Sequence, residues 1–182
     1  MYSSGLAFEE VDQGKMENIV VSNITMSHVH HYPIYITTGC RNRGPKEVTQ
    51  PSSARDIQIS NVIADDCDSL CSIIVTGMKD EPIRNVWLSN IRLYFKGGGM
   101  RDLVNKNYRE QGKNYPEPKF AGWTPAYGLY ARHVEGLHVR DVTFRYDRPD
   151  YRPAIVLDDV RDATLKDIDA PTEPGVEQIV RL

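Results

Sequence analysis

Paired carboxylates are the side chains in this 182-residue sequence that come closest to hydrolytic chemistry. Two aspartate doublets occur, Asp65-Asp66 and Asp158-Asp159, and a carboxylic acid with a carboxylate base can protonate a leaving group and activate water. Each doublet follows alternating apolar residues, which is typical of a strand. Because adjacent side chains on a strand point to opposite faces, one member of each doublet should be solvated or bonded within a turn. We therefore interpret both doublets as structural caps or solvated charges.

Histidine and cysteine spacing does not support a metal site. Three histidines cluster early in the chain: His28, His30 and His31. Strand alternation puts the first two on one face without a cysteine or a third carboxylate ligand nearby, so we expect surface or turn histidines. The three cysteines, Cys40, Cys67 and Cys71, are expected to be free thiols, with a Cys67–Cys71 bridge or metal site as the alternative. No metal and no cofactor are predicted.

A seven-residue phrase recurs along the chain, and such repeats organise whole folds. Three clear copies and two weaker ones occupy residues 18–24, 56–62, 85–91, 136–142 and 162–168. Each is a short alternating strand followed by Ser-Asn or a related pair, where asparagine tolerates the left-handed backbone of a bend. We predict that the bend residues stack as an asparagine ladder, weaker at its last two positions: Asn23, Asn61, Asn90, Asp141 and Asp167.

A second apolar strand precedes each copy of the phrase. These strands occupy residues 5–11, 33–37, 72–76, 128–134 and 154–160. No window of about 11 residues has the apolar spacing of an amphipathic helix, and a β-sandwich does not explain why asparagine recurs at one place in the phrase. The sequence therefore predicts an all-β solenoid of parallel strands with about five coils, forming a single domain over residues 1–182.

Alternation also predicts which side chains face the core. Beside the ladder, the inward residues should be Ile19, Val21, Ile57, Ile59, Val86 and Leu88. On the first strand, Leu6 and Phe8 should point inward, and Ala7 and Glu9 outward. The outward column should continue through Tyr35 and Thr37, Ile74 and Thr76, Tyr130 and Arg132, and Val156 and Asp158.

Two insertions interrupt the repeat, near 39–53 and 97–125. Long loops on a rigid solenoid usually cluster on one face and carry whatever the protein binds. The second insertion contains three large aromatic residues: Tyr108, Tyr115 and Trp123. We expect these rings to pack the loop onto the solenoid, with stacking on a sugar as the alternative.

Charge and hydropathy exclude several partners. The net charge is -3 and basic residues are mixed with acidic ones throughout, so no basic stripe would neutralise nucleic-acid phosphates. No apolar stretch approaches the roughly 20 residues of a membrane span, and the N-terminus has no signal-peptide pattern. We therefore expect neither nucleic acid nor membrane as a partner.

Longer phrases around the repeat are distinctive. They include Gly-Leu-Ala-Phe-Glu-Glu-Val-Asp at 5–12, Met-Glu-Asn-Ile-Val-Val-Ser-Asn-Ile-Thr-Met at 16–26, Tyr-Pro-Ile-Tyr-Ile at 32–36, Ile-Arg-Leu-Tyr-Phe-Lys-Gly-Gly-Gly at 91–99, Tyr-Gly-Leu-Tyr-Ala-Arg-His-Val at 127–134 and Arg-Pro-Ala-Ile-Val-Leu-Asp-Asp-Val at 152–160. Over nearly the whole chain they resemble the C-terminal half of bacterial family-28 glycoside hydrolases, the polygalacturonase-like, pectin-degrading group. The resemblance implies a right-handed parallel β-helix of the pectin-lyase type. It also implies inverting hydrolysis of galacturonan or rhamnogalacturonan without a cofactor.

The chain departs from that family at the catalytic motifs. Family members carry aspartates in Asn-Thr-Asp and Asp-Asp motifs, followed by Gly-His-Gly and Arg-Ile-Lys, on adjacent coils. This sequence has no Asn-Thr-Asp and no Gly-His-Gly, and the Arg-Ile-Lys strand aligns best with Ala7-Phe8-Glu9, where both cations are replaced. We therefore predict no catalytic residue, and expect the chain to be inactive by itself.

Six residues are candidates for contact with an acidic sugar: Glu9, Tyr35, Arg41, Arg43, Tyr130 and Arg132. Tyrosine rings suit the apolar face of a sugar, and guanidinium groups suit a uronate carboxylate. Arg41 and Arg43 are the best candidates for uronate contact. The alternative is that both are surface arginines that pair with nearby acids. Glu9 lies on the strand that matches the family's cleft, where it would touch substrate or position a basic partner; a solvated glutamate is the alternative.

The first functional hypothesis is a C-terminal segment of a polygalacturonase-like hydrolase. A non-catalytic carbohydrate-binding or structural β-helix is the alternative, while a calcium-dependent pectate lyase lacks the clustered acidic ligands it needs. The expected partner is an acidic, pectin-type polysaccharide or oligosaccharide. An open first coil would expose Leu6 and Phe8, so we expect self-association there or a need for upstream coils. The family resemblance implies a secreted or periplasmic location.

Overall fold

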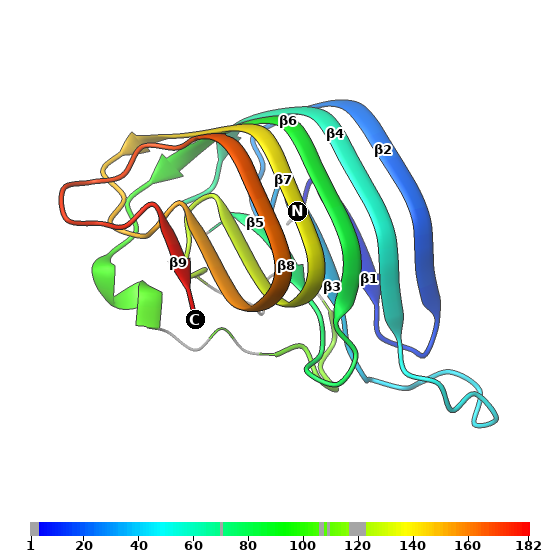
Figure 1. Ribbon diagram of the computed structural model, residues 1–182. Coiled ribbons are helices and arrows are strands. Elements are labelled where there is room, and N and C mark those ends of the chain that lie inside the picture. The colour runs from blue at the N-terminus through cyan, green and yellow to red at the C-terminus, as the bar shows by residue number, and fades with distance from the viewer. Residues whose placement is uncertain (1–3, 70, 106–107, 109, 117–122) are drawn as a thin grey trace.

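Parallel strands account for the architecture of the chain (Figure 1). The computed structural model describes residues 4–69, 71–105, 108, 110–116 and 123–182. Its strands are β1 (Leu6–Glu10), β2 (Lys15–Ser27), β3 (Ile34–Thr38), β4 (Ser53–Cys67), β5 (Ile73–Thr76), β6 (Ile83–Gly97), β7 (Leu129–Arg148), β8 (Ile155–Asp169) and β9 (Ile179–Arg181). Among those residues the only helical element is a short 3-10 turn, η1 (Arg101–Asn105). The all-β prediction is confirmed, and the stacked strands are consistent with a parallel β-solenoid.

The strands form one nine-stranded sheet that wraps around the core (Figure 1). The short strands β1, β3 and β5 lie side by side, as do the long strands β2, β4 and β6, and every one of these pairs is parallel. β7 joins the two series, because Ile73 of β5 pairs with its Leu129 and Ile83 of β6 pairs with its Val134. β8 follows β7 along most of its length and then pairs with β9. Successive windings of the chain therefore lie in register.

Left-handed residues bend each winding at two fixed places. One column has φ between 50° and 63° and is the predicted ladder: Asn23, Asn61, Asn90, Asp141 and Asp167. Asn61 Nδ2 donates to Asn23 Oδ1 at 3.0 Å, and Asn90 Nδ2 donates to Asn61 Oδ1 at 2.8 Å. The ladder prediction is therefore confirmed for the asparagines. Asp141 and Asp167 keep the bend at the last two positions, but a carboxylate lacks the N–H group through which an asparagine donates to the next residue of the column.

A second bend column lies one short strand earlier, and sequence reasoning did not identify it as a ladder. It consists of Asn18, Asp56, Asn85, Gly136 and Asp162, all with φ between 54° and 76°. Asn85 Nδ2 donates to Asp56 Oδ1 at 2.8 Å. At Gly136 an added Cβ would lie 2.9 Å from Asn85 Oδ1, so glycine suits both the backbone angle and the close approach. The two columns make each winding bend sharply between short flat strands.

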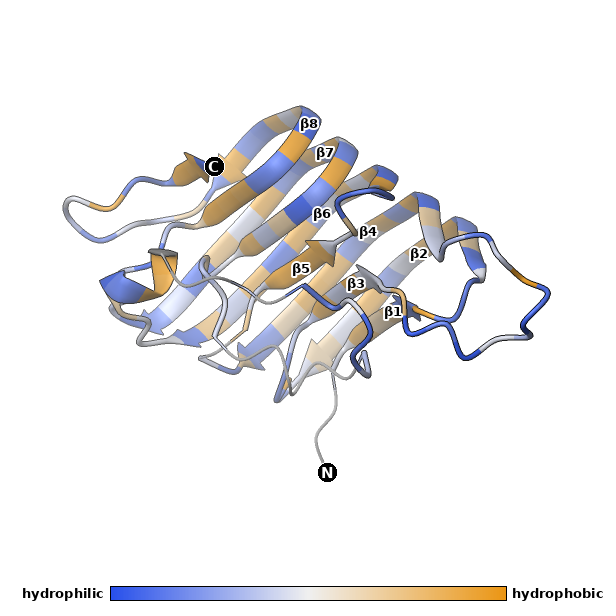
Figure 2. Cartoon of the chain, turned by 90° about the horizontal axis from the view of Figure 1, so that it is seen from below, coloured by the Kyte–Doolittle hydropathy of each residue, from blue (hydrophilic) through white to orange (hydrophobic). Residues whose placement is uncertain are grey.

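The core lies inside the windings, and the strands alternate apolar and polar residues along their length (Figure 2). Four of the six predicted inward residues are fully buried, namely Ile57, Ile59, Val86 and Leu88. Ile19 and Val21 pack against the same core but stay half-buried, because β2 is paired on one side only. The inward assignment is confirmed. The three cysteines are free, as expected, and burial raises the pKa of the Cys67 thiol to about 12.

A buried ion pair anchors both ends of the second insertion. Arg152 and Asp150 are fully buried, with Nη2 to Oδ2 at 2.7 Å and Nε to Oδ1 at 2.9 Å. Asp150 Oδ2 also accepts from the backbone N–H of Gly99 at 3.1 Å, while Arg152 Nη1 donates to Thr124 Oγ1 at 3.1 Å. A further donation from Arg152 Nη2 reaches the carbonyl of Ser69 at 2.8 Å. The pair thus fixes three loops at one point.

Candidate functional site

The outward residues of the short strands form the column that strand alternation predicts. Glu9 is in register with Thr37, Thr37 with Thr76, Thr76 with Arg132, and Arg132 with Asp158. The neighbouring row runs through Ala7, Tyr35, Ile74, Tyr130 and Val156. Four of the six candidate residues therefore lie on one face: Glu9, Tyr35, Tyr130 and Arg132. This face is the outer side of β1, β3, β5, β7 and β8.

Most of that face is covered, which changes the role expected for its tyrosines. Tyr35 and Tyr130 are 1% and 2% exposed, in an apolar cluster with Tyr108 and Ala126. The Tyr108 and Tyr130 ring centroids lie 4.9 Å apart. The rings therefore pack the second insertion against the strands, as expected for Tyr108. Burial raises the pKa of the Tyr130 hydroxyl above its usual range and leaves neither column tyrosine a free face for a sugar.

Charged groups lie where the outward column meets the edge of the second insertion, which covers it. Arg132 Nε lies 3.2 Å from Asp158 Oδ2, without hydrogen-bond alignment, and Nη2 lies 3.6 Å from Glu110 Oε1. Arg132 Nη1 donates to the carbonyl of Tyr108 at 2.9 Å, and the Tyr130 hydroxyl donates to Asp158 Oδ2 at 3.0 Å. Arg132 therefore holds the insertion and the neighbouring strand together.

His133 completes this cluster from the next position of β7. Its Nε2 lies 2.8 Å from Glu110 Oε1 and its Nδ1 lies 2.6 Å from Asp159 Oδ2. The hydrogen bond from His133 is the largest factor that lowers the pKa of Asp159. Because the carboxylates sit at opposite ring nitrogens, the three groups cannot ligate one metal ion. Among the described residues, no three His, Cys, Asp or Glu side chains are grouped to hold one.

The doublet Asp158-Asp159 is explained by the same bend. Asp159 has a φ of 50°, so the chain turns immediately after Asp158 and the second carboxylate lies at a bend. Each member has its own partner, the Arg132 guanidinium for Asp158 and a ring nitrogen of His133 for Asp159. The structural-cap interpretation of this doublet is confirmed. Both carboxylates are engaged by these partners, so the cluster is suited to holding the second insertion and the strands together.

The first insertion presents the other two candidate arginines. Arg41 Nε donates to Asp12 Oδ1 at 3.0 Å, Nη2 pairs with Oδ2, and the guanidinium carbon lies 5.0 Å from the ring centroid of Tyr115. The hydrogen bonds that Asp12 accepts from the Arg41 side chain and from the backbone N–H of Arg43 lower its pKa to about 2. Arg41 is thus a surface arginine paired with an acid. Arg43 is exposed, and its guanidinium forms no ion pair within the described part of the chain.

The two insertions meet, as the clustering of long loops predicts. The backbone N–H of Cys40 donates to the carbonyl of Gly112 at 2.7 Å, and Tyr35 Oη lies 3.4 Å from Gln111 Oε1. Part of the second insertion, residues 106–107, 109 and 117–122, lies outside the described residues. Sequence reasoning missed Glu110 and His133. The insertion has no repeat from which to place Glu110. His133 and Asp159 occupy equivalent positions in consecutive strands, but the sequence does not show that both lie at a bend.

Comparisons with known proteins identify no relative. No protein-family model, no curated protein and no solved structure matches this chain. Within the described ranges, no helix has the length and apolar character of a membrane span.

Proposed function

We propose that this chain is a segment of a right-handed parallel β-helix, of the pectin-lyase type with about five coils, that binds an acidic polysaccharide without cleaving it. It resembles the C-terminal part of polygalacturonase-like, family-28 glycoside hydrolases, whose substrates are galacturonan and rhamnogalacturonan. The observation that carries the proposal is the exposed guanidinium of Arg43, which forms no ion pair with a described residue, beside an Arg41 that is fixed by Asp12. Stacked repeats create extended surfaces, and the loops inserted between them can carry the binding groups.

The exposed basic group beside the column supports an acidic ligand. Arg43 is exposed in the first insertion, where its guanidinium forms no ion pair with a described residue, and Arg41 near it is held in place by Asp12. A guanidinium recognises a carboxylate through two parallel hydrogen bonds. The proposed uronate contact is therefore Arg43, with Arg41 as its positioning neighbour. Glu9, at the β1 end of the outward column, is the proposed contact on the strands.

The absence of the family's catalytic motifs supports binding without turnover. Inversion requires two carboxyl groups about 6.5–9.5 Å apart, one protonated and one ionised. The carboxylates of the Arg132 cluster are instead bound to the Arg132 guanidinium or to the ring nitrogens of His133. We therefore propose no catalytic residue in this chain.

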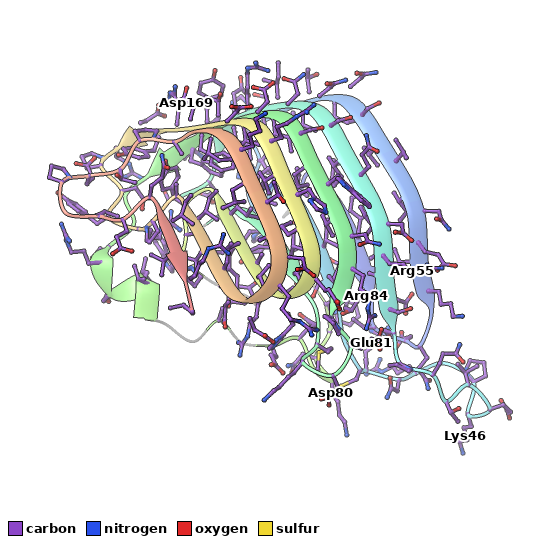
Figure 3. The ribbon with its side chains drawn as sticks, in the orientation of Figure 1. Lys46, Arg55, Asp80, Glu81, Arg84 and Asp169 are labelled. Atoms are coloured by element: carbon purple, nitrogen blue, oxygen red, sulfur yellow. The ribbon has the colours of Figure 1, made fainter. Side chains whose placement is uncertain are left out.

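A sugar-release assay tests this proposal. The pure chain is incubated with polygalacturonate and with rhamnogalacturonan oligosaccharides, and reducing ends and bound ligand are measured. We expect saturable binding, weakened about tenfold in Arg43→Ala and unchanged in Lys46→Ala, a matched cation at the tip of the same insertion (Figure 3). Release of reducing ends at a rate proportional to protein concentration would contradict it.

A purely structural β-helix is the second candidate. The burial of Tyr35 and Tyr130 beneath the second insertion favours it, because that part of the outer face has no surface left for a ligand. No binding of either polymer, with the fold intact by circular dichroism, would support this candidate.

The open edges of β1 and β2 are proposed to pair with further strands. Among the described strands, β1 pairs only with β3 and β2 only with β4, so each has one edge that no described strand covers. Leu6, Phe8 and Met26 are half-buried there instead of fully buried. A second copy of the chain, or upstream coils of the same fold, would cover them.

A further inference from the structure

A groove runs along the outer side of the long strands, on the other side of the core from the short-strand column. It has a volume of about 590 Å³ and crosses β4, β6, β7 and β8. One wall is the register row Gln58, Trp87, His138 and Thr164, and the other is the row Ser89, Arg140 and Lys166. Leu88 and Val139 lie between the rows with their side chains in the core, so the floor is backbone.

The first wall is aromatic. The rings of Trp87 and His138 stack with centroids 5.5 Å apart and an interplanar angle of 17°. Trp87 is nevertheless 38% exposed. A partly exposed indole offers an apolar surface on which the apolar side of a sugar ring can lie.

The second wall carries positive charge without a countercharge. Several other arginines on the long strands have acidic partners: Arg55 with Glu17 at 2.7 Å, Arg145 with Asp169 at 2.6 Å and Arg84 with Glu81 at 2.5 Å, the last pair labelled in Figure 3. Arg92 and Arg148 instead donate to neutral oxygen atoms of described residues. Arg140 and Lys166 form no ion pair with any described residue, although they are direct register neighbours on β7 and β8. Like charges facing each other across a ladder destabilise it, so a bound anion would relieve a repulsion that the chain itself leaves in place.

We propose that this groove is a second glycan site, which binds a uronate residue of an acidic oligosaccharide. The carboxylate pairs with Arg140 and Lys166, the apolar side of the sugar lies against Trp87, and its hydroxyls reach Gln58, Ser89 and Thr164. This inference rests on the proposed function, because it assigns the same class of ligand to a second face. The volume lies within the roughly 300–1,000 Å³ of small-molecule sites.

Other ligands fit the two walls less well. A nucleic acid would need a longer basic track than two neighbouring cations, since its affinity depends on the number of phosphates neutralised. A purely apolar ligand would leave both charges uncompensated. The combination of one aromatic wall, two cations and three neutral hydrogen-bonding side chains favours a carboxylated sugar.

Titration of trigalacturonate into the intact chain, followed by calorimetry, tests the assignment. Single variants Trp87→Ala and Arg140→Ala each should weaken one binding event about tenfold. Matched controls are Tyr94→Ala, an exposed aromatic on the same strand, and Arg145→Ala, a paired arginine on β7; both should leave binding unchanged.

The variants separate the two proposals. Binding that persists in Arg43→Ala but is lost in Arg140→Ala supports the groove and overturns the assignment to the first insertion. Binding that is unchanged in both Trp87→Ala and Arg140→Ala overturns the groove, whatever Arg43→Ala does. Equal binding of the uncharged methyl ester of trigalacturonate also overturns it, because the two cations would then have no role.

Discussion

Nε2 of His133 lies 2.8 Å from Oε1 of Glu110, a contact that joins the second insertion to the stacked strands. The same ring faces Asp159 through Nδ1 at 2.6 Å. A neutral imidazole carries one N–H, so both contacts are hydrogen bonds only when the ring is protonated. The second insertion, which covers the outer column, is therefore held at its edge by the polar contact of Glu110 with His133, and beneath that edge by the contact of the Tyr108 and Tyr130 rings.

Loss of this contact should loosen the cover before it affects the rest of the fold. Glu110→Gln should increase amide hydrogen exchange in residues 108–116 and lower the free energy of unfolding by no more than about 1 kcal/mol, because the carboxylate is partly exposed. Lys113→Gln, an exposed change in the same loop, is the control. Exchange that rises equally in the core strand β6 would show that the cover and the strands open together.

Replacing Asn61 tests the ladder. Asn61→Ala removes two side-chain hydrogen bonds and places alanine at a φ of 55°, which alanine tolerates less well than asparagine, so it should cost about 1–2 kcal/mol in urea unfolding. Asn61→Gly loses the same bonds but accepts the backbone angle, so its loss should be smaller. Equal losses in both variants would mean that the backbone angle contributes nothing.

Replacing Arg152 tests the buried anchor. Arg152→Met leaves Asp150 buried without a cation and should cost about 3–5 kcal/mol in denaturant unfolding. The double variant Asp150→Asn with Arg152→Met should lose less than the sum of the single variants, because no uncompensated charge is left. Arg161→Met, at an exposed ion pair, is the control and should change stability by less than about 0.5 kcal/mol.

The pH dependence of stability should include a contribution from Asp12. Its pKa is lowered from 3.8 to about 2 in the folded chain, so its stabilisation is present above the unfolded pKa and is lost as the pH falls from about 4 towards 2. Carboxyl titration by NMR should show the Asp12 pKa returning towards 3.8 in Arg41→Ala. Arg43→Ala should have a smaller effect, since the backbone N–H of residue 43 still donates. An unchanged Asp12 pKa in Arg41→Ala would contradict the assigned cause.

The free edge of β1 should make association sensitive to Phe8. Light scattering across a concentration series should show self-association that Phe8→Glu reduces, because the substitution puts a charge in the exposed end of the core. Ala7→Glu, on the same strand but facing outward, is the control for added charge. A monomer at all concentrations in the unmodified chain would favour upstream coils over a second copy.

Most of the fold prediction came from the alternation of apolar and polar residues along the strands and from the repeated asparagine. The recurrence of Asn at one place in the repeat predicted the ladder, and alternation predicted that Glu9, Thr37, Thr76 and Arg132 share one face. What covers that face was not predictable, since residues 97–125 have no period from which to place Glu110 or Tyr108. The bend at Asp159 was also hidden, because an aspartate with positive φ looks like any other strand-end aspartate in the sequence. The tyrosines on the column therefore looked like binding residues, although tertiary contact with the insertion buries them.

Calorimetric titration of the pure chain with trigalacturonate and with its methyl ester tests the proposed function most directly. Acidic-glycan binding predicts saturable binding of the acid, weakened by rising salt, and little or none of the ester, because the proposed contacts are guanidinium and ammonium groups. Absence of saturable binding at millimolar ligand, in a chain whose fold is intact by circular dichroism, would contradict it. Equal affinity for acid and ester would also contradict it.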